Sequence, residues 1–191
     1  MLDENFWNSR YQTGETGWDL NVVSPPLKSI IDSISDKNTS LLIPGCGNAH
    51  EAHYLVKQHF KNITVIDIAA NPVKKLQAQF LNEEVTVIHG DFFAHRGKYD
   101  LILEQTFFCA LDPVLRGAYV QKCYDLLKPT GCIRGVLFNV VFDKQGPPFG
   151  GSAEEYQSIF SKYFKFNQFE VCTHSVEKRQ GNELLINFQK T

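Results

Sequence analysis

Apolar positions along the chain follow two spacings, one typical of helices and one typical of buried strands. Ser24 and Pro25 precede an apolar series at helical spacing and predict a helix with Ser24 as N-cap and Pro25 at its first position; the series is Leu27, Ile30, Ile31 and Ile34. The apolar run 41–43 then predicts a strand, closed by the turn sequence Pro44-Gly45-Cys46-Gly47. A second helical series follows at Ala49, Ala52, Leu55 and Val56.

The same alternation of strand and helix continues through the middle of the chain. Further strands are predicted at 63–68, 85–88, 99–103 and 132–142. Helices are predicted to begin at Asn71-Pro72 and at Asp112-Pro113, the latter running to residue 127. Strands that are apolar on both faces and alternate with helices are typical of a parallel sheet covered on both sides. The predicted fold class is therefore α/β, with a doubly wound sheet.

The C-terminal part of the chain breaks this rhythm. A glycine- and proline-rich loop at 146–151 precedes Ser152, which forms a capping box with Glu155. Two β-rich stretches follow, at 164–174 and 184–188, and predict a hairpin-like pair with an antiparallel edge strand. Because no repeat or long linker divides the sequence, we expect residues 1–191 to form a single domain.

The first glycine-rich turn marks the candidate site, because ligands of doubly wound sheets bind beyond the carboxyl ends of the strands. Gly45 and Gly47 permit a sharp strand-to-helix reversal and a close approach of ligand to backbone. Asp67 ends the next strand at the spacing expected for a carboxylate that binds ribose hydroxyls. Asp91 and Phe92, after the third strand, can supply a polar adenine contact beside an aromatic wall. The pattern predicts a nucleoside site.

Two nucleoside cofactors compete for this site. The dinucleotide fingerprint requires glycine or alanine three positions after its second glycine, where this chain has His50, which counts against NAD. S-adenosylmethionine has no phosphate and needs only the tight turn, a ribose acid, an adenine pocket and room for a sulfonium. His50 and His53 have a spacing that metal ligands can use, but no third ligand accompanies them, so no metal site is predicted.

Composition and charge narrow the expected partners. The formal net charge of −2 over 191 residues gives no broad electrostatic footprint for nucleic acid or an anionic membrane. The cysteines are odd in number, scattered and never spaced C-x-x-C, which favours a reducing cytoplasm over a disulfide framework; they are Cys46, Cys109, Cys123, Cys132 and Cys172. Asp3 and Glu4 lie where a signal peptide would be basic, and no apolar run reaches the length of a membrane span. We therefore expect a soluble, cytoplasmic protein.

Short motifs spread over residues 6–150 resemble those of one enzyme family. They are Phe6-Trp7-Asn8-Ser9-Arg10-Tyr11, Gly14-Glu15-Thr16-Gly17-Trp18-Asp19, Leu42-Ile43-Pro44-Gly45-Cys46-Gly47, Tyr99-Asp100-Leu101-Ile102, Phe107-Phe108-Cys109-Ala110-Leu111, Tyr124-Asp125-Leu126-Leu127-Lys128-Pro129 and Gly146-Pro147-Pro148-Phe149. The sequence is similar to class I S-adenosylmethionine-dependent methyltransferases, and within them to the thiopurine S-methyltransferase family with its plant halide and thiol methyltransferase branch. The resemblance implies a Rossmann-like methyltransferase fold: a mostly parallel seven-stranded sheet with helices on both faces and an antiparallel edge strand.

The resemblance also implies S-adenosyl-L-methionine as cofactor and S-adenosyl-L-homocysteine as product. It implies that Trp7, Tyr11 and Trp18 cover the cofactor and the reacting centre, which makes residues 1–23 an N-terminal lid segment. The other implied cofactor contacts are Gly45, Cys46 and Gly47 at the amino-acid moiety, Asp67 and Ile68 at the ribose, Asp91 and Phe92 at adenine, and Glu104 and Gln105 near the methionine part.

A pocket for the methyl acceptor is expected beside the cofactor. Its aromatic candidates are Phe6, Trp18, Phe107, Phe108, Phe138 and Phe149, and Arg116 is the candidate cation for an anionic acceptor. The chain departs from the plant branch at Phe138 and Gln105, which both replace a tyrosine. A thiolate or halide is already nucleophilic, so no residue is assigned to acid–base catalysis.

The resemblance favours methyl transfer to a small soft nucleophile, namely a thiol, thiocyanate, halide or heterocyclic thiol. Two alternatives stay open: a small-molecule O- or N-methyltransferase with the same cofactor, and a non-catalytic S-adenosylmethionine-binding protein. The segment 104–107 lacks the Asn/Asp-Pro-Pro-aromatic motif of base N-methylation. The expected partner is a small-molecule acceptor, with no nucleic acid, membrane or metal, and the sequence is compatible with a monomer.

Overall fold

The computed structural model describes residues 2–191, so Met1 of the expected lid segment lies outside the described residues. The helices are α1 (Glu4–Thr13), α2 (Pro25–Asp32), α3 (His50–Lys57), α4 (Ala70–Gln79), α5 (Arg116–Leu126) and α6 (Ala153–Phe160). Three short 3-10 helices are η1 (Phe108–Ala110), η2 (Pro113–Leu115) and η3 (Glu177–Arg179). The strands are β1 (Ser40–Pro44), β2 (Asn62–Asp67), β3 (Val85–His89), β4 (Tyr99–Gln105), β5 (Leu127–Phe138), β6 (Phe164–Val171) and β7 (Glu183–Lys190).

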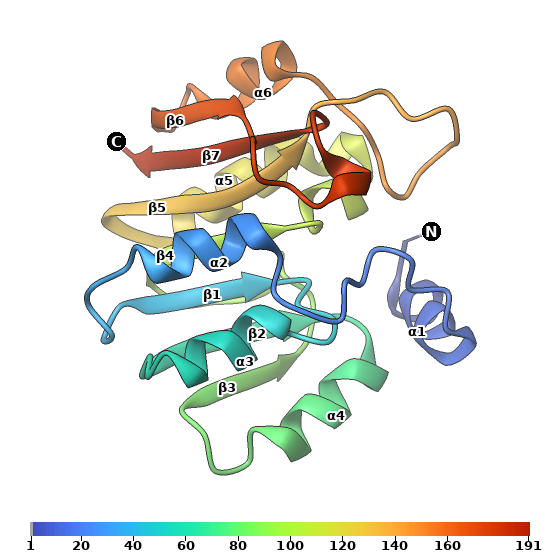
Figure 1. Cartoon of the computed structure of the whole chain (residues 1–191), viewed down its shortest axis with the longest axis vertical. Coiled ribbons are helices and arrows are strands. Elements are labelled where there is room, and N and C mark those ends of the chain that lie inside the picture. Colours follow the sequence, from blue (N-terminus) through green and yellow to red (C-terminus); the bar gives the residue numbers. More distant parts are fainter. Residues whose placement is uncertain (1) are drawn as a thin grey trace.

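All seven strands join one sheet in the order β3-β2-β1-β4-β5-β7-β6 (Figure 1). The first five strands pair in parallel, and β7 runs antiparallel to both β5 and β6. The predicted doubly wound sheet with an antiparallel strand is thus confirmed. The strand that opposes the others, β7, lies between β5 and the edge strand β6.

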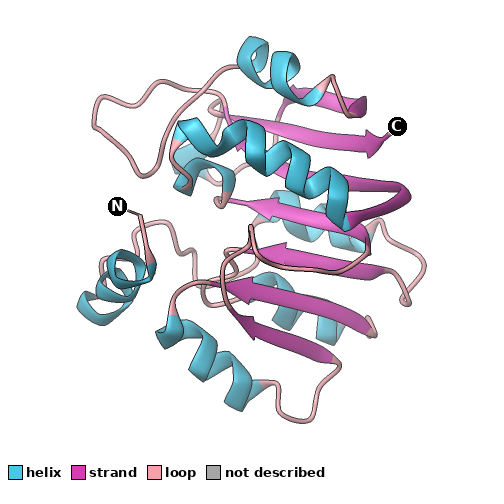
Figure 2. Cartoon of the chain, turned by 180° about the vertical axis from the view of Figure 1, so that it is seen from behind, coloured by secondary structure: helices cyan, strands magenta, loops and turns pink. Residues whose placement is uncertain are grey.

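Helices cover both faces of the sheet and divide the core in two (Figure 2). One cluster unites buried residues of α2 and α3, such as Leu27 and Leu55, with β1 and β2. The other unites α5, α6 and the far side of the sheet through Tyr119, Tyr156 and Phe160. These strands are apolar on both faces because each face is buried under helices.

The strand order reverses beside β1, whose neighbours are β2 and β4. Connections diverge to opposite faces at this point and leave a crevice beyond the carboxyl ends of the strands. In Figure 1, α1 and the loop between β5 and α6 project from this same edge of the sheet. The N-terminal helix therefore lies where a ligand of such a sheet binds.

Two predicted element boundaries were wrong. The helix expected from Asp112-Pro113 begins as the 3-10 turn η2, capped by the Asp112 side chain, and becomes α-helical at Arg116. The strand expected at 132–142 instead spans Leu127–Phe138; its ladder with β7 ends at the Phe138–Glu183 pair, followed only by the bond from the Asn139 N–H to the Asn182 carbonyl. Among residues 2–191, no helix is both long and apolar enough to cross a bilayer.

A buried carboxyl group fixes the corner that follows β4. Glu104 Oε1 accepts bonds from the N–H groups of Phe107 and Phe108, both at 2.9 Å, and Oε2 accepts one from the Tyr119 hydroxyl at 2.6 Å. Only 1% of Glu104 is exposed. Burial raises the pKa of Glu104 to about 7, although these three donors act in the opposite direction.

Glu104→Gln should remove one pH dependence of stability. The folded pKa of about 7 exceeds the ordinary value of 4.5, so between these pH values the folded state retains a proton that the unfolded state has lost. Raising the pH through this window should remove up to about 3 kcal/mol of the free energy of unfolding through Glu104 in the unmodified chain, and the variant should lose less by this amount because it lacks the titrating group. Urea unfolding of both proteins at pH 5 and pH 8 measures this. If the unmodified protein and the variant differ in free energy of unfolding by the same amount at both pH values, the prediction is contradicted.

Candidate active site

The turn after β1 is shaped by two glycines in the left-handed region, with φ of 58° at Gly45 and 50° at Gly47. A Cβ atom at Gly45 would lie 2.2 Å from Cδ2 of Phe107, and one at Gly47 would lie 2.5 Å from the Tyr11 hydroxyl. Both positions therefore require glycine for conformation and for space. The turn is also where α1 and the segment after β4 meet β1.

The carboxylate of Asp67, at the end of β2, connects this turn with the next one. Oδ2 accepts the Gly47 N–H at 2.8 Å, and Oδ1 accepts the Ala69 N–H at 2.8 Å. Burial raises the pKa of Asp67, and these N–H bonds oppose the shift. A carboxylate has about four acceptor positions, so those left over can accept ribose hydroxyls. The turn and Asp67 thus fit the nucleoside expected from the sequence.

Aromatic side chains of α1 lie against this turn. The Trp18 ring makes edge contacts with Trp7 and Tyr11 at centroid distances of 5.6 and 5.9 Å, and Phe6 packs edge-on against Trp7 at 5.1 Å. Burial, followed by the charge of Asp67, raises the pKa of Tyr11. These four rings form what we call the N-terminal aromatic cluster.

Polar contacts hold α1 over the carboxyl ends of the strands. Asn8 Oδ1 accepts the N–H of Asn71, at the start of α4, at 3.0 Å. His89 Nε2, at the end of β3, lies 3.2 Å from the Glu4 carboxylate. The helix thus contacts the segments that follow β2 and β3 as well as the glycine turn.

A second set of contacts fixes the segment that follows α1. The Asp19 carboxylate accepts bonds from the Asn48 amide and lies 2.7 Å from His50 Nε2. Burial raises the pKa of Asp19, but hydrogen bonds from Asn21, Asn48 and His50 outweigh it and lower the pKa overall. The Trp18 carbonyl accepts a bond from Arg179 at 2.7 Å.

A small cavity of about 10 Å³ opens beyond β4 and β5, roughly the space of one water molecule. Its lining includes Glu104, Gln105, Thr106, Cys109, Phe138 and Glu183. Burial raises the pKa of Glu183, opposed by Ser175, Arg179 and Gln105. Of the expected acceptor residues, Phe138 lines this cavity, and the Phe107 ring lies at the glycine turn, where it would meet a Cβ atom at Gly45.

Three expected site residues have mainly internal contacts. Phe108 is buried against Tyr119 and Tyr156. Phe92 is buried against Phe107 and Tyr119, while the neighbouring Asp91 is exposed and accepts the Phe93 N–H. Glu104 is almost fully buried and accepts three hydrogen bonds within the core, which argues against the contact with the methionine part that the sequence led us to expect.

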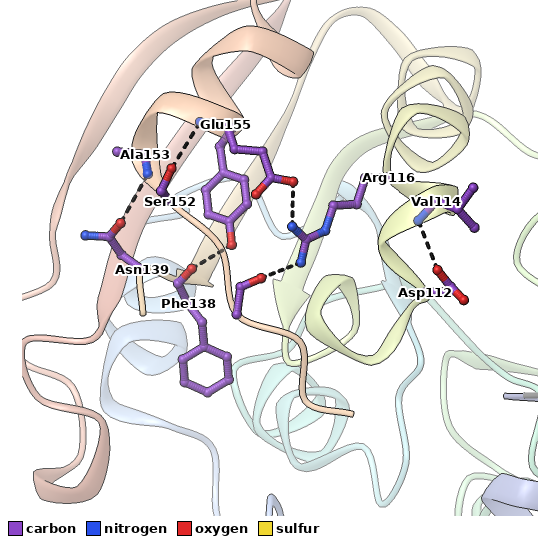
Figure 3. A network of polar contacts seen from close by, with 10 residues as sticks. Asp112, Val114, Arg116, Phe138, Asn139, Ser152, Ala153 and Glu155 are labelled. Carbon is purple, nitrogen blue, oxygen red and sulfur yellow. Dashed lines mark hydrogen bonds and ion pairs between the residues drawn. The ribbon is translucent and has the colours of Figure 1, made fainter. Parts of the chain in front are cut away.

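Arg116 is also placed differently from the expectation. Its guanidinium bonds to the Glu155 carboxylate of α6 (Figure 3) and to the Gly150 carbonyl at 2.6 Å. It also lies over the Phe108 ring, and only 4% of the residue is exposed. The side chain therefore ties the start of α5 to α6 and its preceding loop, an arrangement that argues against binding the acceptor.

The remaining residues expected in the site make hydrogen bonds close to the glycine turn or to the ends of β2 and β4; they are Cys46, Ile68, Phe149 and Gln105. The Cys46 N–H bonds to the Ile66 carbonyl, and the Ile68 carbonyl lies 3.1 Å from His89 Nε2. The Phe149 N–H bonds to the Cys109 carbonyl at 2.7 Å, which brings the β5–α6 loop to η1. Gln105 Oε1 accepts a bond from the Ser24 hydroxyl at 2.7 Å.

Sequence reasoning assigned no role to Asp19, Arg179 or Glu183. Asp19 ends one of the motifs that resemble the family, and this was the only sequence feature that could have pointed to a role for it. Arg179 lies in a polar connection, and its bond to Trp18 spans 161 residues. No local pattern reports a pairing over that distance.

The chain is similar in sequence to known methyltransferases. The sequence family described as "Thiopurine S-methyltransferase (TPMT)" matches residues 2–189. The chain is 26% identical to thiocyanate methyltransferase 1 of Brassica oleracea over 99% of this chain and 86% of the relative. It is 28% identical to a probable thiol methyltransferase 2 of Arabidopsis thaliana, over 100% and 88%, and 29% identical to a thiopurine S-methyltransferase of Vibrio cholerae, over 84% and 82%.

Solved structures share the fold. A 1,6-didemethyltoxoflavin-N1-methyltransferase of Burkholderia thailandensis, with bound S-adenosylhomocysteine, matches with a TM-score of 0.80 at 18% identity, over 98% of this chain and 87% of that one. The N-methyltransferase NodS of Bradyrhizobium japonicum, also with S-adenosylhomocysteine, matches with a TM-score of 0.76 at 16% identity, over 98% and 99%.

These structures confirm the Rossmann-like methyltransferase fold, and the family match identifies an S-adenosylmethionine-dependent methyltransferase. The glycine turn and Asp67, which were expected to hold this cofactor, are the features that the fold brings together. The chain belongs to the thiopurine S-methyltransferase family.

Proposed function

We propose that this protein transfers the methyl group of S-adenosylmethionine to a small soft nucleophile: a thiol, thiocyanate, halide or heterocyclic thiol. The bond between Asp67 and the Gly47 N–H, beneath the N-terminal aromatic cluster, is the observation that carries the proposal. The names of the relatives, which include thiol, thiocyanate and thiopurine methyltransferases, support this acceptor class.

In this proposal, different residues bind the cofactor, position it and exclude water. When bound, S-adenosylmethionine supplies an electrophilic methyl group on a positively charged sulfur. Asp67 holds the ribose hydroxyls, and Gly45 and Gly47 give the amino-acid moiety access to the backbone. Trp7 and Trp18 exclude water and offer aromatic faces that favour a cation. Residues 1–23 thereby act as a lid over the cofactor.

The acceptor is proposed to bind near the cavity beyond β4 and β5, close to Phe107 and Phe138. Burial raises the pKa of the Glu104 carboxyl group there to about 7, which reduces the negative charge that an anionic nucleophile meets. An anionic nucleophile needs no proton removed, so positioning and exclusion of water supply the catalysis. Arg116 has no part in this proposal because its guanidinium is committed to α6 and Gly150.

We also place the protein in the cytoplasm. All five cysteines are free thiols, as suits a reducing compartment.

Titration calorimetry with S-adenosylhomocysteine tests cofactor binding, and a labelled methyl donor with a panel of acceptors tests the chemistry. We expect product from thiols, thiocyanate or iodide. Product from alcohols or amines alone would replace the proposal with O- or N-methylation, and binding without any product would indicate a non-catalytic protein.

Asp67→Ala should weaken S-adenosylhomocysteine binding by about 1–3 kcal/mol, because it removes charge-assisted hydrogen bonds to the ribose. Calorimetry under conditions where circular dichroism shows both proteins folded measures the change. Asp125→Ala removes an exposed carboxylate of α5 and serves as the matched control. Wild-type affinity in the Asp67 variant would exclude this residue from the site.

Arg116→Ala should act on stability and not on the acceptor. Loss of its bonds to Glu155 and Gly150 should lower the free energy of unfolding by about 2 kcal/mol, with the acceptor KM close to that of the unmodified protein. Urea unfolding and steady-state kinetics separate the two effects, and Arg96→Ala controls for loss of an exposed positive charge. A raised KM at unchanged stability would return Arg116 to the acceptor pocket.

A further inference from the structure

The guanidinium of Arg179 joins the N-terminal segment to the C-terminal strands of the sheet. This residue ends η3, just before β7, and its side chain is only 11% exposed. It donates to the Trp18 carbonyl at 2.7 Å, lies 3.7 Å from the Glu183 carboxylate, and sits 5.9 Å from the centre of the Phe138 ring. One side chain thus contacts the lid, the end of β5 and the start of β7.

Glu183 extends this connection to the other end of the lid segment. Its buried carboxylate adjoins Arg179 and the Gln105 side chain, and it lines the small cavity together with Gln105. Gln105 in turn accepts the Ser24 hydroxyl at 2.7 Å. Ser24 is the N-cap residue of α2, directly after the lid segment. The lid connection from Trp18 to Ser24 is therefore fastened at both ends to neighbours of Glu183.

The Gln105 amide nitrogen is buried, and the Gln105 side chain interacts with the Glu183 carboxyl group closely enough to oppose the rise in its pKa. The lid and the cavity thus share one polar cluster, made of Arg179, Glu183, Gln105, Ser24 and the Trp18 carbonyl. We call it the Glu183 cluster.

We propose that Arg179 is a positioning residue that couples closure of the lid to the shape of the acceptor cavity. With the Trp18 carbonyl bound, Arg179 holds Trp18 in the aromatic cluster and holds Glu183 beside Gln105. Without that bond, the lid connection loses one of its two fixed ends and Glu183 loses its ion pair. This inference rests on the proposed cofactor site beneath the lid.

The sequence provides a specific reporter of this coupling. Its only two tryptophans are Trp7 and Trp18, and both belong to the aromatic cluster. Tryptophan emission and its quenching by acrylamide therefore read the lid alone. In Arg179→Ala we expect quenching to rise and the Kd for S-adenosylhomocysteine to increase about tenfold, as for loss of a hydrogen bond to a charged group. Arg179→Lys should give intermediate values, and Lys178→Ala, an exposed change on the same 3-10 helix, should change neither.

A double-mutant cycle distinguishes coupling through the lid from direct contact with the acceptor. Asp19→Asn weakens the neighbouring anchor of the lid, so its effect and that of Arg179→Ala on the Kd should be less than additive. Additive effects, or a raised acceptor KM with unchanged quenching and Kd, would overturn the proposal and make Arg179 an acceptor-binding residue.

Should Arg179→Ala fail to fold, the comparison of Arg179→Lys with the unmodified chain decides, and equal quenching and Kd would overturn the coupling. The unmodified protein separates this inference from the proposed function. If it binds no S-adenosylhomocysteine, the proposed function itself fails. If it binds normally while the Arg179 variants behave like the unmodified protein, only the coupling fails.

Discussion

The bonds from the Asp67 carboxylate to the N–H groups of Gly47 and Ala69 are the constraint on which the site depends. Each bond satisfies a backbone donor that the sheet and helices leave unpaired where a strand turns into a helix. Together they fix the turn after β1 against the turn after β2. In the proposed function, the remaining acceptor positions of the same carboxylate bind the ribose hydroxyls of the cofactor.

The N-terminal segment is built around this junction. The hydroxyl of Tyr11 lies where a side chain at Gly47 would be. Glycine is therefore needed here both for the conformation of the turn and to make room for the N-terminal segment. Asp19 and Trp18 then fasten the chain to α3 and to η3, at opposite sides of the crevice. The N-terminal segment is thus held by residues from both halves of the sheet, so a change in either half can alter its position.

Local patterns in the sequence were sufficient to predict the sheet, the glycine turn and Asp67, because each strand, turn and helix there is formed by consecutive residues with a clear apolar period. The end of β5 was misplaced because its antiparallel partner β7 begins at Glu183, opposite Phe138, and the apolar pattern at 139–142 carries no sign of where that distant partner begins. The partners of Arg116 were missed for the same reason: from sequence alone, an arginine after a helix-start signal shows no sign of Glu155 and Gly150, which the fold brings to it. Charged side chains with distant partners could not be placed from sequence periodicity.

The cysteines give the fold a chemical consequence of its own. Four of the five are buried, and burial raises the pKa of the Cys46, Cys109 and Cys123 thiols as well as that of the partly buried Cys132. A raised pKa keeps sulfur protonated and slow to react. A catalyst that brings together an alkylating agent and sulfur nucleophiles would otherwise be at risk of modifying itself. By shielding its own sulfur atoms in the interior, the protein avoids competing with its substrate.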